Sequence, residues 1–187
     1  LQGPKAPEVM SKVAGSWSKE LKFFDFKETS IENIPVLIAR SGWSGEVGYE
    51  IYLRDESKGN KLWEIFMEAG MEYNIAPATP SQINRIENGM LSYGSDMTLN
   101  ENPFEINMGK FVDLDKKANF LSKEALSRIY KQGVKKELVG IEIISDPFND
   151  FVVDHLILQF DNKKVGKITS SVYSPRLKKN IGLALID

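Results

Sequence analysis

The sequence contains no cysteine and only one histidine. Without cysteine the chain cannot form a disulfide, a thiolate zinc site, an iron–sulfur ligation or a thiol nucleophile, and this fits a reducing compartment. A two-histidine zinc site is excluded as well. No signal peptide is visible. We therefore predict a cytoplasmic protein without a metal site.

An excess of one charge and a long apolar run are also missing. The chain carries 24 Lys and Arg against 26 Asp and Glu, a formal net charge of −2, so nothing indicates nucleic-acid binding. No apolar run approaches the roughly 20 residues that span a bilayer, so we expect no membrane partner. The 187 residues suit one large domain, or a domain with a small module. The chain opens with "LQGPKA" as though inside a fold, which leads us to expect a fragment of a longer protein.

Residues 1–110 alternate between helical and strand-like patterns. Apolar residues at helical spacing predict helices over 6–15 and 62–70. Strand-like runs occupy 20–26 and 34–40. This mixture predicts an α+β domain.

Two more helices have recognisable starts. Thr79 is predicted to cap the first, with Pro80 in the opening turn and Gln82 completing a capping box. The second lies in a connecting region, 111–136, and is predicted to begin at Ser122. Its hydrophobic staple would be Leu121 and Leu126, and Gly133 would end it.

The last part of the chain, 137–187, has a different sequence pattern. It consists of short strand-like segments, "ELVGIEIIS", "HLILQF", "VGKITSSVY" and "NIGLALI", and "DNKK" is typical of a hairpin turn. These segments predict a small β-barrel or sandwich.

The segment "SGWSGEVGYEIYL", residues 41–53, combines a glycine-rich turn with a strand. Because side chains alternate along a strand, Tyr49 falls on the core face and Glu50 with Tyr52 on the other. One interpretation is a polar face in water. The other is a pocket floor, where the Glu50 carboxylate accepts N–H groups from a flat heterocycle between aromatic rings. Trp17, Trp43 and Tyr52 would supply those rings.

Two other patterns of residues suggest a site, but each lacks a part that the site needs. Asp113, Asp115 and Glu124 have the spacing of a calcium loop, but Lys117 stands where an oxygen ligand is needed. His155, the one histidine, follows an aspartate, yet no G-x-S-x-G segment accompanies it, so a Ser–His–Asp triad is not predicted.

Four segments, in order, resemble the glycine-cleavage T-protein superfamily of folate-dependent transferases: "LQGPKA", "RSGWSGEVGYEIYL", "RIENGMLSYGSDMTLNENPFE" and "VGKITSSVYSPRLKKNIGLALI". The resemblance covers nearly the whole chain. It implies a folate-binding domain of antiparallel sheet and helices, of which 1–110 is the second half, followed by a carboxy-terminal β-barrel, 137–187. In the family, the glutamate that matches Glu50 holds the pterin end of tetrahydrofolate. Because a flat ring suits aromatic neighbours, we expect Trp43 and Tyr52 to bind the cofactor as well.

Within the superfamily the chain resembles dimethylsulfoniopropionate demethylases most. This implies transfer of a methyl group from a sulfonium donor to tetrahydrofolate, with Trp17 facing the cation. Ser81 stands where T-proteins commonly have arginine, which speaks against aminomethyl transfer. That activity nevertheless stays an alternative, as does a non-catalytic folate-binding remnant. Relatives that serve iron–sulfur proteins carry a "K-G-C" segment, which this chain lacks.

The expected partners are therefore a small methyl donor and tetrahydrofolate. If half of the folate domain is missing, an apolar face is left exposed. Such a face is expected to drive either aggregation or the formation of a homodimer.

Overall fold

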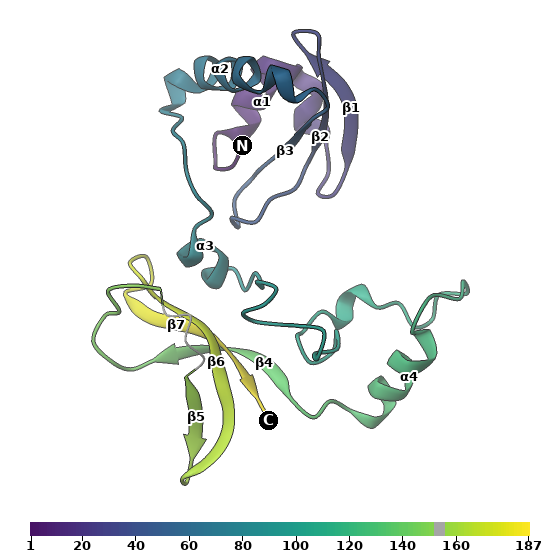
Figure 1. Ribbon diagram of the computed structural model, residues 1–187, viewed down its shortest axis with the longest axis vertical. Helices are drawn as coiled ribbons and strands as arrows, with labels where there is room; N and C mark the ends of the chain where they lie inside the picture. The colour runs from purple at the N-terminus through teal and green to yellow at the C-terminus, as the bar shows by residue number, and fades with distance from the viewer. Residues whose placement is uncertain (152–155) are drawn as a thin grey trace. The chain divides into compact units, whose positions relative to one another are not determined.

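The computed structural model describes residues 1–151 and 156–187. These residues form two compact units, Leu1–Asn84 and Arg85–Asp187 (Figure 1). We describe each unit by itself.

In the first unit, two helices pack on one face of a small antiparallel sheet with the strand order β1-β2-β3. The strands are β1 (Phe26–Ile31), β2 (Ile34–Ala39) and β3 (Glu50–Leu53); the α-helices are α1 (Ala6–Ala14) and α2 (Gly59–Gly70), and three short 3₁₀ helices are η1 (Ser16–Glu20), η2 (Glu56–Lys58) and η3 (Met71–Tyr73). Residues of α1, α2 and the sheet meet in one core, which includes Met10, Ile38, Tyr49 and Leu62. Both predicted helices are confirmed, and α1 ends at Gly15, whose φ of 100° suits glycine.

The first predicted strand, 20–26, is wrong. Residues 22–25 form a turn instead, in which the backbone N–H of Lys22 donates to the Asp25 carboxylate and the N–H of Asp25 donates to the Lys22 carbonyl. The strand begins only at Phe26 and pairs with β2 through a two-residue turn, Glu32–Asn33, in which both φ angles are positive. That turn geometry suits the twist of a hairpin. The second predicted strand, 34–40, is confirmed as β2.

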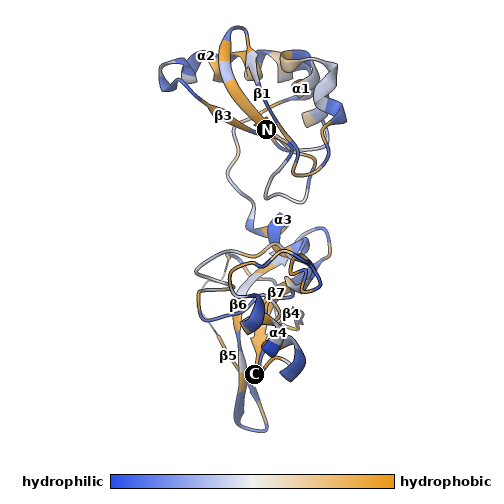
Figure 2. Cartoon of the chain, turned by 90° about the vertical axis from the view of Figure 1, so that its right-hand side faces the viewer, coloured by the Kyte–Doolittle hydropathy of each residue, from blue (hydrophilic) through white to orange (hydrophobic). Residues whose placement is uncertain are grey.

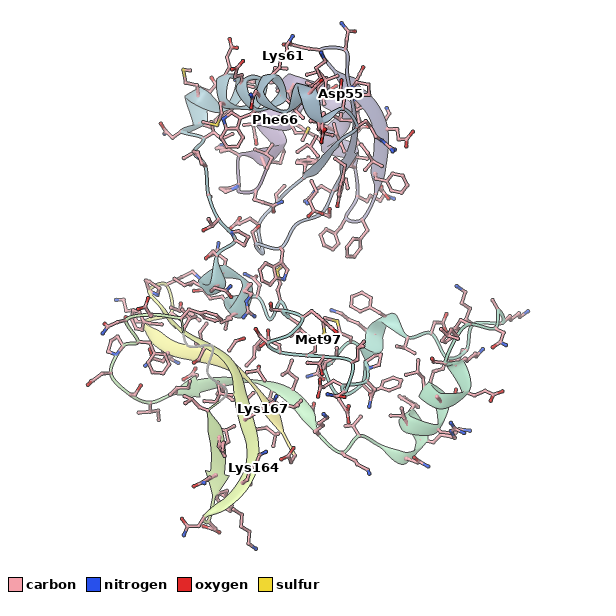
Figure 3. All side chains as sticks on the ribbon, in the orientation of Figure 1. Asp55, Lys61, Phe66, Met97, Lys164 and Lys167 are labelled. Atoms are coloured by element: carbon pink, nitrogen blue, oxygen red, sulfur yellow. The ribbon has the colours of Figure 1, made fainter. Side chains whose placement is uncertain are left out.

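The second unit is built on a four-stranded antiparallel sheet with the order β4-β7-β6-β5. Its strands are β4 (Glu137–Ile143), β5 (Ile157–Phe160), β6 (Lys163–Ser174) and β7 (Lys179–Ile186); its helices are α4 (Lys123–Gln132) and the 3₁₀ helix η4 (Gly109–Phe111), while α3 (Gln82–Glu87) crosses the division between the units. The predicted hairpin turn is confirmed, because Asp161 and Asn162 both have positive φ between β5 and β6. Lys164 and Lys167 lie on this hairpin (Figure 3).

The second unit contains a buried ionic network. Arg85 donates to Asp96 over 2.7 Å, and both side chains are almost fully buried. Asp96 also accepts hydrogen bonds from Thr169 and Ser170 of β6, at 2.7 and 2.5 Å, and from the backbone N–H of Ser92 at 2.8 Å. Hydrogen bonds therefore connect two of the segments that resemble the family, "RIENG…GSD" and "ITSS". Their charged and hydroxyl groups are structural.

Two further carboxylates in this unit are held by cations. Burial would raise the pKa of Glu87, but hydrogen bonds from Ser174 and Arg176 outweigh it and lower the pKa. Glu101 accepts from Lys136 over 2.5 Å, and this hydrogen bond lowers the pKa of Glu101 to about 2. Both carboxylates therefore stay ionised near neutral pH.

The start of α3 differs from the prediction. The helix begins at Gln82, and its cap is Ser81, whose Oγ accepts the backbone N–H of Asn84 at 3.1 Å. Thr79 and Pro80 instead line a pocket described below.

The start of α4 also differs. Ser122 has a left-handed backbone and makes no side-chain cap, and Leu121 is 95% exposed, so the predicted cap and staple are wrong. The predicted end at Gly133 is confirmed. The helix is strongly polar, as the blue colour in Figure 2 shows, so few apolar contacts fix its start.

Candidate ligand pocket

A cavity of about 650 Å³ opens in the first unit beside β3. Its wall is mostly apolar and aromatic, with a few polar groups. The lining includes Gln2, Gly42, Trp43, Ser44, Glu46, Glu50, Ile51, Trp63, Phe66, Met67, Ile75, Pro77, Thr79, Pro80 and Ser81. Phe66 is labelled on α2 in Figure 3. An apolar wall with few polar groups is typical of a small-molecule site.

Glu50 is the strand residue that brings negative charge to this cavity. It lies at the start of β3 on the sheet face opposite the core, as its alternation with buried Tyr49 predicts. Its Oε2 accepts the hydroxyl of Ser41, and the Tyr52 hydroxyl lies 3.4 Å from the same oxygen. The hydroxyls hold one carboxylate oxygen, so the carboxylate is oriented while its side chain remains exposed.

The glycine-rich turn before β3 is shaped by Gln2. The Gln2 amide nitrogen donates to the Ser41 carbonyl at 3.2 Å, and its amide oxygen accepts the Ser44 hydroxyl at 2.8 Å. A Cβ on Gly42 or on Gly48 would overlap this amide. A side chain at either position would therefore displace the Gln2 amide, so the two glycines allow this amide to lie against the turn.

The four residues predicted to form the site are not all together. Glu50 and Trp43 line the cavity, and Tyr52 reaches the Glu50 carboxylate from outside it. Trp17 does not line the cavity. Its ring packs against the core, and the Lys27 ammonium lies 4.1 Å from the ring centroid. The proposed contacts of all four with ligands stay predictions.

Tyr52 contributes instead to a shallow apolar hollow of about 360 Å³ on the outer face of the sheet. This surface is lined by Phe24, Phe26, Leu37, Ala39, Ser41 and Tyr52. Phe24 and Phe26 are each 66% exposed. Whether this hollow is the expected apolar face, and whether it joins two copies, stay predictions.

Sequence reasoning missed Gln2 and Ser41 as site residues. The only signal for Gln2 is its place in "LQGP", which precedes α1 and lies far from β3 in the sequence. The structure brings it to the turn because Gln2 and Gly48 form an isolated antiparallel bridge. Ser41 is revealed only by its two roles, as hydroxyl donor to Glu50 and carbonyl acceptor for Gln2.

The residues that the structure describes contain no group of three or more His, Cys, Asp or Glu side chains able to hold a metal ion. The Asp113 carboxylate instead accepts the backbone N–H groups of Asp115 and Lys116, as in an ordinary turn. Across that same described part, no helix is long and apolar enough to cross a membrane. His155 lies outside the described residues.

Comparison with known families identifies the class of protein. Residues 1–116 match the GCVT N-terminal domain, and residues 136–187 match the glycine cleavage T-protein C-terminal barrel domain. The chain therefore belongs to the glycine cleavage T-protein family. The second match confirms the predicted carboxy-terminal β-domain, in which the described strands form one antiparallel sheet with the order β4-β7-β6-β5.

Individual relatives support this assignment. The chain is 41% identical to an aminomethyltransferase of Caldanaerobacter subterraneus and 32% identical to the dimethylsulfoniopropionate demethylase DmdA of Ruegeria pomeroyi, covering 100% of this chain and 50% of each relative. The crystal structure of the glycine cleavage system aminomethyltransferase T from Bartonella henselae has the same fold, with a TM-score of 0.78 and 21% identity over 98% of this chain and 49% of that one. The chain thus spans about half the length of the curated relatives it matches.

Proposed function

We propose that the cavity beside β3 holds the pterin end of tetrahydrofolate, and that the whole protein transfers a one-carbon group to or from this cofactor. The observation that carries the proposal is the Glu50 carboxylate, oriented by Ser41 at the wall of a cavity that Trp43 also lines. A pterin ring presents an exocyclic amine and a ring N–H side by side, and one carboxylate accepts both. Its flat ring suits an aromatic wall.

Aminomethyl transfer is the finer activity with more support among the relatives. The Caldanaerobacter relative named aminomethyltransferase is 41% identical to this chain, against 32% for the named demethylase. Transfer of this kind needs mainly alignment of the donor carbon with the folate nitrogen, which is catalysis by proximity. No described residue has to act as a metal ligand for it.

Methyl transfer from a sulfonium such as dimethylsulfoniopropionate is the second candidate. One observation favours it: Ser81, and not the arginine common in T-proteins, lines the cavity. One observation weighs against the predicted cation contact at Trp17, because the Lys27 ammonium already lies 4.1 Å from that ring centroid. A like charge beside Lys27 would be repelled.

The expected cytoplasmic location and homodimer also stay proposals. The outer sheet face around Leu37 and Tyr52 is the apolar surface that a second copy would cover. If it does, Leu37→Glu should shift the protein from dimer to monomer in light scattering, because a carboxylate would be buried without a partner. A wild-type protein that is already monomeric would contradict the dimer.

Calorimetric titration with tetrahydrofolate tests the central proposal. Glu50→Gln replaces one carboxylate oxygen by an amide and should weaken binding by about 1.5–3 kcal/mol. Glu28→Gln is the matched control, since Glu28 lies on the same sheet but outside the cavity and pairs with Arg54. Equal affinity of wild type and Glu50→Gln would refute the pterin assignment. Weakened binding would justify a comparison of aminomethyl and sulfonium donors.

A further inference from the structure

Ser41 anchors two different polar groups at the edge of the cavity. Its hydroxyl donates to the Glu50 carboxylate, and its backbone carbonyl accepts from the Gln2 amide at 3.2 Å. Both groups belong to residues that line the cavity. One is an acceptor and the other a donor, and a single residue fixes them side by side.

The orientation of the Gln2 amide follows from its partners. A backbone carbonyl only accepts, so the group that faces the Ser41 carbonyl must be the amide nitrogen. The Ser44 hydroxyl then donates to the amide oxygen at 2.8 Å. The amide nitrogen carries two hydrogens, and the Ser41 carbonyl takes one of them. The second hydrogen is a further donor on the same nitrogen.

The pterin edge has a matching pattern. Next to the exocyclic amine and the ring N–H, both donors, stands a ring carbonyl, which is an acceptor. A carboxylate can accept hydrogen bonds from the two donors, and an amide N–H can donate one to the carbonyl. The cavity offers these two kinds of group in neighbouring positions, on Glu50 and on Gln2.

We propose that Gln2 is a specificity-determining residue that donates a hydrogen bond to the ring carbonyl of the bound pterin, next to the N–H groups that Glu50 accepts. The proposal rests on the proposed folate function and deepens it. It also gives a second reason for the glycines of the turn. A side chain at Gly42 or Gly48 would displace the amide from this position.

The test compares two small ligands, a tetrahydropterin and its thiocarbonyl analogue, by calorimetric titration. Both present the same two donors to Glu50, but sulfur is a much weaker acceptor than oxygen. The wild-type protein should prefer the carbonyl ligand by about five- to tenfold, the range of one neutral hydrogen bond. In Gln2→Met, which keeps the volume and loses the amide, this preference should fall to near one.

Two further variants keep the proposal testable if Gln2→Met does not fold. Gln2→Glu keeps the shape but replaces the donor by an acceptor, so it should also lose the preference. Gly48→Ala keeps glutamine at position 2, but the added Cβ would displace the amide of that side chain. It should have the same effect as removing the amide.

Glu50→Gln is the matched control, because it should weaken both ligands by a similar factor and keep the preference for the carbonyl. A folded Gln2 variant that keeps the wild-type preference would overturn the proposal. This includes a Gln2 variant that weakens the binding of both ligands by the same factor, because that result is expected if Gln2 only supports the turn. Failure of the proposed function gives a different result: the wild-type protein binds neither ligand, or Glu50→Gln binds both as tightly as wild type.

Discussion

Two carboxylates show how differently the two units use the same chemistry. In the second unit Asp96 is almost completely buried and is surrounded by donors from Arg85, Thr169 and Ser170. In the first unit Glu50 is exposed, and the hydrogen bonds it receives from Ser41 and Tyr52 reach one oxygen only. A buried charge needs full pairing to be tolerated, whereas a binding group must keep part of its capacity for the ligand.

The same contrast holds for glycine. A Cβ on Gly182 in β7 would lie 2.6 Å from the Ser170 carbonyl oxygen, which belongs to the neighbouring strand backbone. A Cβ on Gly48 would meet only the end of the Gln2 side chain. A substitution at Gly182 is thus limited by fixed backbone, whereas one at Gly48 is limited by a side chain that can move.

The largest expected effect is the loss of the buried ion pair. Asp96→Asn removes the carboxylate charge that pairs with the buried Arg85 guanidinium and should cost about 3–5 kcal/mol of unfolding free energy. Urea unfolding followed by circular dichroism measures it. All three tryptophans, at positions 17, 43 and 63, belong to the first unit, so tryptophan fluorescence reports that unit separately. We expect the fluorescence transition to move less than the dichroism transition.

The control for this prediction is Glu142→Gln, which breaks the exposed pair with Lys179. Because both partners are more than half exposed, the cost should stay below about 1 kcal/mol. Equal costs for the two variants would contradict the distinction between buried and exposed charge.

The glycine comparison predicts an intermediate effect. Gly182→Ala forces two paired strands apart and should cost about 1–3 kcal/mol. Gly48→Ala should cost less, because the Gln2 side chain can turn away. Thermal unfolding of the two variants measures the difference. A larger loss for Gly48→Ala would show that the turn is part of the stable core.

The pH dependence of the second unit should be smaller but specific. The Lys136 hydrogen bond lowers the pKa of Glu101 to about 2, below its value in the unfolded chain. Stability from this pair is therefore complete above about pH 4.5 and is lost as the pH falls toward about 2. Urea midpoints over this range should fall less steeply in Glu101→Gln than in wild type. Glu87, whose pKa is also lowered, supplies part of the slope that remains.

The smallest effect is expected at Leu121. Its side chain is 95% exposed, so Leu121→Ser should change the unfolding free energy by less than about 0.5 kcal/mol. Leu138→Ala is the matched control: Leu138 is only 3% exposed and should cost about 2–5 kcal/mol. A large effect of Leu121→Ser would indicate that the predicted staple forms in solution.

The sequence by itself determined the local elements with strong periodic signals. Helix α1, strand β2 and the turn at Asp161 and Asn162 follow from spacing and turn chemistry, because their hydrogen bonds lie close in the sequence. Alternation along β3 likewise separated Tyr49 from Glu50. The resemblance of the segments to the family predicted a ligand at the same strand.

Only the tertiary structure decided what the polar residues do. Arg85 and Ser170 stand 85 positions apart, and Gln2 and Ser41 stand 39 apart, so no local pattern links either pair. Polar groups of one type become structural where burial forces full pairing, and they become ligand-facing where a cavity leaves part of their capacity open. Which outcome occurs depends on long-range packing, and that is why the network around Asp96 and the position of the Gln2 amide beside the cavity could be seen only in the fold.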